Sequence, residues 1–252
     1  MPSSATAADH ALAARAATEA GRLLVDLRQS LMDSPMHPRD MGDEGDRQAH
    51  RFLVDLLARE APGDAVLSEE GRDDLRRLDA ERVWIVDPVD GTREFSEPGR
   101  TDWAVHVALA IGGELAAGAV ALPARGLTLG TDPPPATPPL PADGPRILVS
   151  RTRPPQQARH IQAALGGTLV PLGSAGAKAM AVVLGEADVY AHAGGQYEWD
   201  NAAPAAVALA AGLHASRLDG RPLRYNQADP WSPDLLICRP ELVGPVTAAL
   251  HG

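Results

Sequence analysis

The segment VWIVDPVDGT, residues 83–92, places two carboxylates at the end of an apolar run. Residues 83–86 predict a buried strand, and the proline and glycine that follow end it. Asp87 and Asp90 therefore stand where a strand meets a loop, and buried carboxylates cost free energy unless they are paired or bind a metal. A plain turn is the alternative interpretation, because Asp-Pro and Asp-Gly are common turn dipeptides.

The overall composition restricts the partners of the chain. Its 252 residues allow one large domain or two lobes, and its hydrophobic fraction of 44% is typical of a globular protein. The net charge of −10 argues against wrapping a nucleic acid polymer. An anionic small substrate stays compatible with this charge, because a bound divalent metal can invert the local field.

The sequence carries no sign of export or of a membrane partner. The single cysteine, Cys238, has apolar neighbours and predicts a buried strand thiol rather than a disulfide. Residues 1–21 contain Asp9 and Glu19 and lack the apolar core of a signal peptide. No uncharged apolar stretch reaches the roughly 18 residues of a membrane span. We therefore expect a cytoplasmic protein.

The first half of the chain predicts helices on an antiparallel sheet. Apolar residues at helical spacing predict a helix over residues 7–29. Residues 34–45, SPMHPRDMGDEG, are rich in proline, glycine and charge and predict a loop, after which Asp46 lies near the start of a helix over residues 47–60. Residues 102–113 alternate as a strand does.

The second half alternates strands and helices, which predicts an α/β layer with mostly parallel strands. Between the halves, residues 131–145 hold seven prolines and mark a boundary between lobes over residues 1–144 and 145–252. An exposed loop within one domain is the alternative interpretation of this segment.

Three groups of carboxylates stand at predicted junctions: Glu69 with Glu70, Asp87 with Asp90, and Asp200. Carboxylates at junctions can converge in a cleft, and an all-oxygen ligand set suits Mg²⁺. Two such ions can clamp a phosphate ester. For Asp200 a second interpretation stays open, namely that it caps the helix that follows.

The turn after Asp90 suits phosphate chemistry. The amides of Gly91 and Thr92 can point at a phosphate oxygen, and the Thr92 hydroxyl can hold an attacking water. Glu69 can take a proton from that water or bind it through a metal.

Three segments together resemble the inositol monophosphatase-like family of Mg²⁺-dependent, Li⁺-sensitive phosphatases. DPVDGTREF, residues 87–95, is similar to the family signature DPxDGTxxF. LSEE, residues 67–70, and WDNAAPAAVALAAG, residues 199–212, resemble its second and third motifs and follow in the family's order. The resemblance covers most of the chain and implies a layered α-β-α-β-α sandwich. Segments such as GSAGAKAM, residues 173–180, are most similar to the bacterial CysQ type, the 3′-phosphoadenosine 5′-phosphate phosphatases.

The resemblance also implies roles for individual residues and two or three Mg²⁺ ions. One ion is expected on Glu69, Asp87 and the Val89 carbonyl, and a second on Asp87, Asp90 and Asp200. A third, weaker ion is expected between Glu69 and Asp46. The catalytic residues implied are Asp46, Glu69 and Thr92, while Asp90, Gly91, Thr92 and Asp200 face the substrate.

Two departures from the family pattern concern this site. The family usually has a lysine and a threonine in the loop before the Asp46 position, whereas residues 38–46 read PRDMGDEGD. Val89 replaces the more usual leucine or isoleucine, which changes little because only a carbonyl is needed there.

Residues in the second half are expected to select the leaving group. Ser174 and the amides that follow it can meet an anion, and Lys178 is expected either on the nucleotide or on a solvated helix face. Ser150 and Arg151 follow a strand where a second phosphate can bind, and Arg224 with Tyr225 can flank a base. Four further residues are interpreted as packing or cleft wall: His106, His192, Tyr197 and Trp199.

These expectations combine into one hypothesis and three rivals. The resemblance implies hydrolysis of 3′-phosphoadenosine 5′-phosphate to AMP and phosphate, which removes a by-product of sulfate activation, and a homodimer. An inositol-1-monophosphatase and a fructose-1,6-bisphosphatase are rivals within the same chemistry. A metal- or nucleotide-binding relative without turnover is the rival from another class.

Overall fold

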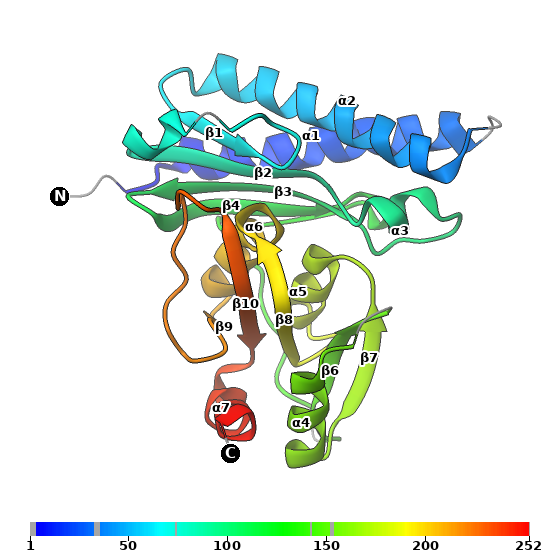
Figure 1. Ribbon diagram of the computed structural model, residues 1–252, viewed down its shortest axis with the longest axis vertical. Helices are drawn as coiled ribbons and strands as arrows, with labels where there is room; N and C mark the ends of the chain where they lie inside the picture. Colours follow the sequence, from blue (N-terminus) through cyan, green and yellow to red (C-terminus); the bar gives the residue numbers. More distant parts are fainter. Residues whose placement is uncertain (1–3, 33–35, 74, 142, 152–153, 252) are drawn as a thin grey trace.

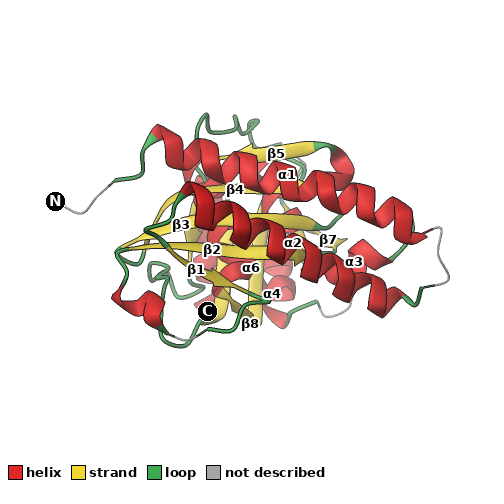
Figure 2. Cartoon of the chain, turned by 90° about the horizontal axis from the view of Figure 1, so that it is seen from above, coloured by secondary structure: helices red, strands yellow, loops and turns green. Residues whose placement is uncertain are grey.

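The computed structural model describes residues 4–32, 36–73, 75–141, 143–151 and 154–251 as five stacked layers (Figure 1). Helices α1 and α2 cover the outer face of a first sheet, where they lie side by side (Figure 2). Helices α5 and α6 lie between this sheet and a second one, and α4 and α7 close the far side. The expected α-β-α-β-α sandwich is therefore confirmed.

The elements follow the chain in this order: α1 (Ala7–Met32), α2 (Pro38–Glu60), β1 (Ala65–Ser68), η1 (Arg76–Asp79), β2 (Arg82–Asp90), α3 (Thr92–Ser96), β3 (Ala104–Ile111), β4 (Glu114–Leu122), η2 (Pro123–Arg125), β5 (Leu127–Gly130), β6 (Arg146–Ser150), α4 (Gln156–Leu165), β7 (Thr168–Leu172), α5 (Ala175–Val183), β8 (Val189–Tyr197), α6 (Glu198–Ala210), β9 (His214–Ser216), β10 (Trp231–Cys238), η3 (Pro240–Leu242) and α7 (Val243–His251).

Both sheets are mixed. The first has the order β1-β2-β3-β4-β5, with β1 and β2 parallel and the other neighbours antiparallel. The second has the order β7-β6-β8-β10-β9, in which β7, β6 and β8 are parallel while β10 pairs antiparallel with both β8 and β9. The expectation of a mostly parallel second sheet thus holds only for β7, β6 and β8.

Strand β2 is buried on both faces, which explains its continuous apolar run. Trp84 and Val86 pack against α1 and α2, whereas Val83 and Ile85 pack against α5 and α6. The core that Val83 and Ile85 form with α5 and α6 continues into the second sheet through Leu148. The two sheets therefore share one interior layer of helices, α5 and α6.

The loop expected over residues 34–45 is wrong from Pro38 onward, because α2 begins there. Pro38 is the first residue of the helix, a position that tolerates proline, and His37 caps it through Nδ1, which accepts a hydrogen bond from the Arg39 amide. The glycines of the segment serve close packing instead of a turn. A Cβ at Gly42 would lie 2.6 Å from the Thr92 methyl carbon, and one at Gly45 would lie 2.7 Å from the Phe95 ring. Asp46 consequently lies inside the helix, facing α3.

The proline-rich connection between β5 and β6 contains no helix or strand among its described residues. The boundary expected at residues 144 and 145 falls in this connection, and each sheet takes its strands from one side of it.

Candidate metal-dependent active site

A β-bulge at the end of β2 turns two carboxylates toward the same space. Asp87 pairs with His106 and Asp90 pairs with Ala104, so three steps along β2 oppose two steps along β3. In a regular strand, residues three apart point to opposite faces. The extra residue re-aims the side chain, and Asp87 and Asp90 therefore converge.

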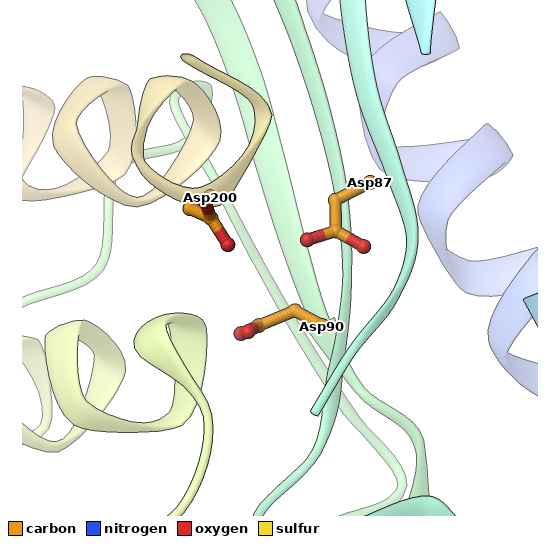
Figure 3. Close-up of side chains that lie close together, drawn as sticks. All are labelled: Asp87, Asp90 and Asp200. Carbon is orange, nitrogen blue, oxygen red and sulfur yellow. The ribbon is translucent and has the colours of Figure 1, made fainter. Parts of the chain in front are cut away.

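Asp200 joins this pair from the first turn of α6, and oxygen atoms of the three carboxylates lie within 4.8 Å of one another (Figure 3). Its Oδ2 accepts a hydrogen bond from the Tyr197 amide at 2.6 Å, which caps the helix. The cap interpretation and the ligand interpretation of Asp200 are thus compatible, because the cap occupies one carboxylate oxygen.

The electrostatics of this cluster fit a cation. Asp87 is 1% exposed, and no donor among the described residues reaches its Oδ1. Burial, followed by repulsion from Glu69, Asp90 and Asp200, holds the pKa of Asp87 well above its usual range. Burial together with the Asp90 charge likewise raises the pKa of Asp200 to about 6. Oxygen ligands crowded in this way match the preference of a hard divalent ion.

Glu69 and Asp46 extend the cluster toward α2. Glu69 follows β1, where its amide donates to the Val86 carbonyl at 3.3 Å, and burial followed by repulsion from Asp200 and Glu70 raises its pKa to about 7. Burial raises the pKa of Asp46 to about 8, with further contributions from Glu70 and Glu69. Glu69 and Asp46 therefore lie close enough to repel each other, and Asp46 comes from within helix α2.

Thr92 lies between Asp46 and the β2 bulge. Its hydroxyl is within hydrogen-bond distance of the Val89 carbonyl, at 3.2 Å, and of Asp46 Oδ1, at 3.4 Å. Gly91 precedes it with φ +89°, a conformation that side-chain-bearing residues rarely adopt. A Cβ at Gly91 would lie 2.8 Å from the Cβ of Ser174. This turn therefore touches the start of α5 in the second half of the chain.

Sequence reasoning missed His106, which it interpreted as a packed strand histidine. The residue is fully buried, and its Nε2 forms an ion pair with Asp90 Oδ2 at 3.1 Å. Burial opposes its charged form, but attraction to Asp90 and hydrogen bonding outweigh this and raise the pKa of His106. The sequence offered one signal for this role, because His106 is the polar residue on a strand face that otherwise consists of alanines. In the structure it stands opposite Asp87 in the antiparallel register.

Ser174 and Lys178 lie at the start of α5, close to Gly91. Ser174 caps α5 by accepting a hydrogen bond from the Ala177 amide at 3.1 Å. Lys178 does not lie on a solvated helix face, because it is 5% exposed. Its ammonium donates to the Ser174 carbonyl at 2.7 Å and to the Gly173 carbonyl, and burial lowers its pKa to about 8. Lys178 thus stabilises the turn before α5.

Ser150 and Arg151 lie beside that turn. Ser150 ends β6 opposite Leu172, just before the turn. Arg151 pairs with Glu94 at 2.5 Å and with Glu97 at 3.2 Å, both from the α3 region. The structure therefore brings Arg151 to the edge of the site, with its charge already balanced by two carboxylates.

The structure does not bring Arg224 to the carboxylate cluster. Its guanidinium pairs with Glu114, next to the β3–β4 turn, whereas Asp90 lies at the opposite end of β2 and β3. Tyr225 is buried and its hydroxyl donates to Asn201 Oδ1 at 2.9 Å, so it does not lie beside the carboxylate cluster as a free base contact. Both residues line a cavity of about 380 Å³ on another side of the α6 first turn.

Other histidine and aromatic expectations have mixed outcomes. His192 is a partly buried strand residue whose Nε2 bonds with the Gly195 carbonyl at 2.9 Å, as the packing interpretation requires. Tyr197 is 41% exposed and stacks on Trp199 with ring centroids 4.7 Å apart. Tyr197 therefore lies on the surface and not in the hydrophobic core.

The comparisons with known proteins agree with this geometry. The sequence profile of the inositol monophosphatase family matches residues 1–236. The chain belongs to the inositol monophosphatase family. A curated relative from Mycobacterium tuberculosis (strain CDC 1551 / Oshkosh), named 3′-phosphoadenosine 5′-phosphate phosphatase, is 55% identical over 233 residues, which cover 89% of this chain and 86% of the relative.

The chain is also similar to more distant members of the family, in sequence and in structure. The Escherichia coli (strain K12) protein named 3′(2′),5′-bisphosphate nucleotidase CysQ is 32% identical over 192 residues, covering 72% of this chain and 78% of that protein. The crystal structure of CysQ from Bacteroides thetaiotaomicron superposes with a TM-score of 0.78 at 26% identity, covering 92% of this chain and 97% of that one. Among the described residues, no helix is long and apolar enough to cross a membrane.

Proposed function

We propose that this protein is a Mg²⁺-dependent phosphomonoesterase that hydrolyses 3′-phosphoadenosine 5′-phosphate to AMP and phosphate. The observation that carries the proposal is the convergence of Asp87, Asp90 and Asp200, with a buried Asp87 oxygen that no described donor reaches, beside the Gly91 turn. The substrate assignment is supported by the relatives' names.

The carboxylate set is proposed to hold two or three Mg²⁺ ions. Glu69, Asp87 and the Val89 carbonyl are assigned to one ion, and Asp87, Asp90 and Asp200 to another, with Asp46 and Glu69 beside a third. When bound, such ions supply Lewis acidity and lower the pKa of a coordinated water.

The protein's own groups orient the reactants. Thr92 can donate its one hydroxyl hydrogen to either Asp46 Oδ1 or the Val89 carbonyl, which leaves lone pairs on Thr92 Oγ1 to accept a hydrogen bond from the attacking water. The amides of Gly91 and Thr92 are proposed to bind the scissile phosphate. Holding water and phosphate in fixed orientation contributes much of the rate in such reactions.

The turn before α5 and the end of β6 are proposed to read the rest of the nucleotide. Ser174 lies against Gly91, and Arg151 pairs with Glu94, whose carboxylate also lies beside Gly91. Ser150 ends β6 next to the turn before α5, and Lys178 stabilises that turn by donating to the Ser174 carbonyl. For a second phosphate to bind Arg151, the phosphate must replace Glu94 or Glu97 as the partner of the guanidinium.

The cytoplasmic location and the homodimeric state stay predictions. Light scattering on the purified protein tests the homodimeric state.

The test is phosphate release with Mg²⁺ from 3′-phosphoadenosine 5′-phosphate, inositol 1-phosphate and fructose 1,6-bisphosphate in parallel, each with and without Li⁺. We expect a strong preference for the nucleotide and inhibition by Li⁺. A preference for either sugar phosphate would keep the metal chemistry and reject the substrate assignment. No release from any of the three would favour a binding protein without turnover.

The matched variant for this assay is Asp90→Asn, which keeps the shape of a proposed ligand and removes its charge. We expect turnover to fall by at least about a thousandfold, because the scale of losing a transition-state charge stabiliser is 10²–10³ and the variant also weakens the metal site. Circular dichroism should show a preserved fold. Near-normal turnover would contradict the two-metal arrangement.

A further inference from the structure

His106 lies at the meeting point of three elements that form the metal site. It is fully buried on β3, with the end of β2, the start of α5 and the start of α6 around it. Its Nε2 lies 3.1 Å from Asp90 Oδ2, and its Nδ1 donates a hydrogen bond to the Trp199 carbonyl at 3.0 Å. A Cβ at Gly176 would lie 2.1 Å from Nε2, so the ring is wedged against the first turn of α5.

The contacts of Asp90 distinguish its two oxygens. Oδ2 accepts a hydrogen bond from the Gly176 amide at 2.5 Å and also faces His106, whereas Oδ1 accepts one from the Ala175 amide at 3.0 Å. A carboxylate oxygen offers two lone pairs. Oδ2 is therefore covered on two sides, by the Gly176 amide that donates to it and by the imidazole edge 3.1 Å away, although Nε2 forms no directed hydrogen bond. Oδ1 accepts one amide hydrogen bond and keeps a lone pair for a cation.

The second nitrogen of His106 acts on Asp200. The Trp199 carbonyl belongs to the first turn of α6, directly before Asp200, so the Nδ1 hydrogen bond holds that turn against β3. Asp90 comes from the first half of the chain and Asp200 from the second. One rigid imidazole therefore spans the two halves at the point where their carboxylates meet.

We propose that His106 is a positioning residue that fixes the separation of the Asp90 and Asp200 carboxylates and selects Asp90 Oδ1 as the oxygen offered to the divalent cation. This inference rests on the proposed metal-dependent function. Residues that orient metal ligands typically contribute 10–100-fold to metal affinity or activity. His106 belongs to this group although it touches neither substrate nor metal.

The test compares two variants that each keep one nitrogen of the ring. His106→Asn retains a donor near the Nδ1 position and loses the contact with Asp90, whereas His106→Gln retains a donor near the Nε2 position. His214→Asn is the matched control, because His214 is a partly buried histidine on β9 whose Nε2 bonds with the Ser216 hydroxyl at 2.8 Å. Mn²⁺ affinity of the metal-free protein is measured by calorimetry, alongside kcat, KM and the thermal midpoint in EDTA.

We expect His106→Asn to weaken Mn²⁺ binding by 10–100-fold and to lower kcat, with KM for the nucleotide changed by less than about threefold. His106→Gln should recover part of the affinity, because it restores the contact with Asp90 and not the hydrogen bond to the Trp199 carbonyl. His214→Asn should match the wild type. If His106→Asn does not fold, Gly176→Ala displaces both the ring and Asp90 Oδ2, which lies 3.0 Å from the added Cβ, and should lower the affinity at least as much.

Two results would overturn the inference: His106→Asn, or Gly176→Ala in its place, binding Mn²⁺ as tightly as the wild type, or His106→Gln binding no better than His106→Asn. Failure of the proposed function looks different, because the wild-type protein itself would then bind no divalent cation or release no phosphate.

Discussion

Asp46, Glu69 and Asp200 are carboxylates that the fold holds in their protonated form more strongly than water does. Burial is the first cause for each, and repulsion within the cluster adds to it, which raises their pKa values to about 8, 7 and 6. Carboxyls of the unfolded chain titrate near pH 4. These carboxyls therefore bind protons more tightly in the folded chain than in the unfolded chain. The stability that proton binding gives the folded state is fully present below about pH 4 and is lost as the pH rises through 6 to 8.

This difference predicts a pH dependence of the metal-free protein. We expect the free energy of unfolding, measured with urea in EDTA, to fall as the pH rises from about 5 to about 8. Glu69→Gln removes one of the raised groups, so its slope should be shallower than that of the wild type. Saturating Mg²⁺ should flatten the slope of the wild type, because the ion replaces the protons. A wild-type free energy that rises over this range in EDTA would contradict the electrostatic account.

At the level of elements, the turn from β2 into α3 tests how backbone geometry supports the site. Gly91 has φ +89° and meets Ser174, whereas Gly126 has φ +62° and open space around its missing Cβ. Alanine at either position costs about 1–2 kcal/mol in the left-handed region. We expect Gly126→Ala to lose only that stability and to keep full phosphate release.

Gly91→Ala should lose more stability than Gly126→Ala and reduce phosphate release by more than about tenfold, because the added methyl group also pushes the turn away from α5. Urea denaturation and the phosphate assay measure the two effects. Equal activity in the two variants would show that the contact between Gly91 and Ser174 does not serve catalysis.

The same elements show what local sequence patterns can and cannot predict. The β2 strand, its terminal carboxylates and the α/β character of the second half follow from apolar runs and from residues whose chemistry needs a cation, whereas the layered sandwich was implied by the family resemblance. The start of α2 does not, because Gly42 and Gly45 resemble loop residues until α3 packs against them. His106 was missed for a related reason: its partners, Asp90 and Trp199, reach it only through the bulge in β2 and the docking of α6.

At the scale of the whole molecule, the site exists only because the two halves of the chain are joined. α6 comes from the second half and packs on the first sheet (Figure 1). This packing carries Asp200 to the carboxylates at the end of β2 (Figure 3). Ion pairs add to this junction at its edges: Arg151 pairs with Glu94 and Glu97, and Arg125 pairs with Glu186 at 2.5 Å. Each pair joins a residue of one half to a residue of the other.

These two ion pairs separate a role in substrate selection from a role in joining the halves. We expect Arg151→Gln to raise KM for 3′-phosphoadenosine 5′-phosphate by about tenfold, equivalent to about 1.4 kcal/mol, while turnover of inositol 1-phosphate and Mn²⁺ affinity stay unchanged. The physical reason is the loss of a cation beside the approach to Gly91, which a substrate with one phosphate does not use.

Arg125→Gln is the control for this experiment, because Arg125 also bridges the halves but lies on an exposed surface. The exposed Arg125 pair contributes about 0–1 kcal/mol, so Arg125→Gln should lose little stability. Arg151→Gln should lose more, because it leaves the buried Glu94 carboxylate without its partner. If Arg125→Gln raised KM for the nucleotide as much as Arg151→Gln does, the effect would come from the junction between the halves. A selective effect of Arg151→Gln on the bisphosphate would instead assign to this arginine the recognition of the second phosphate.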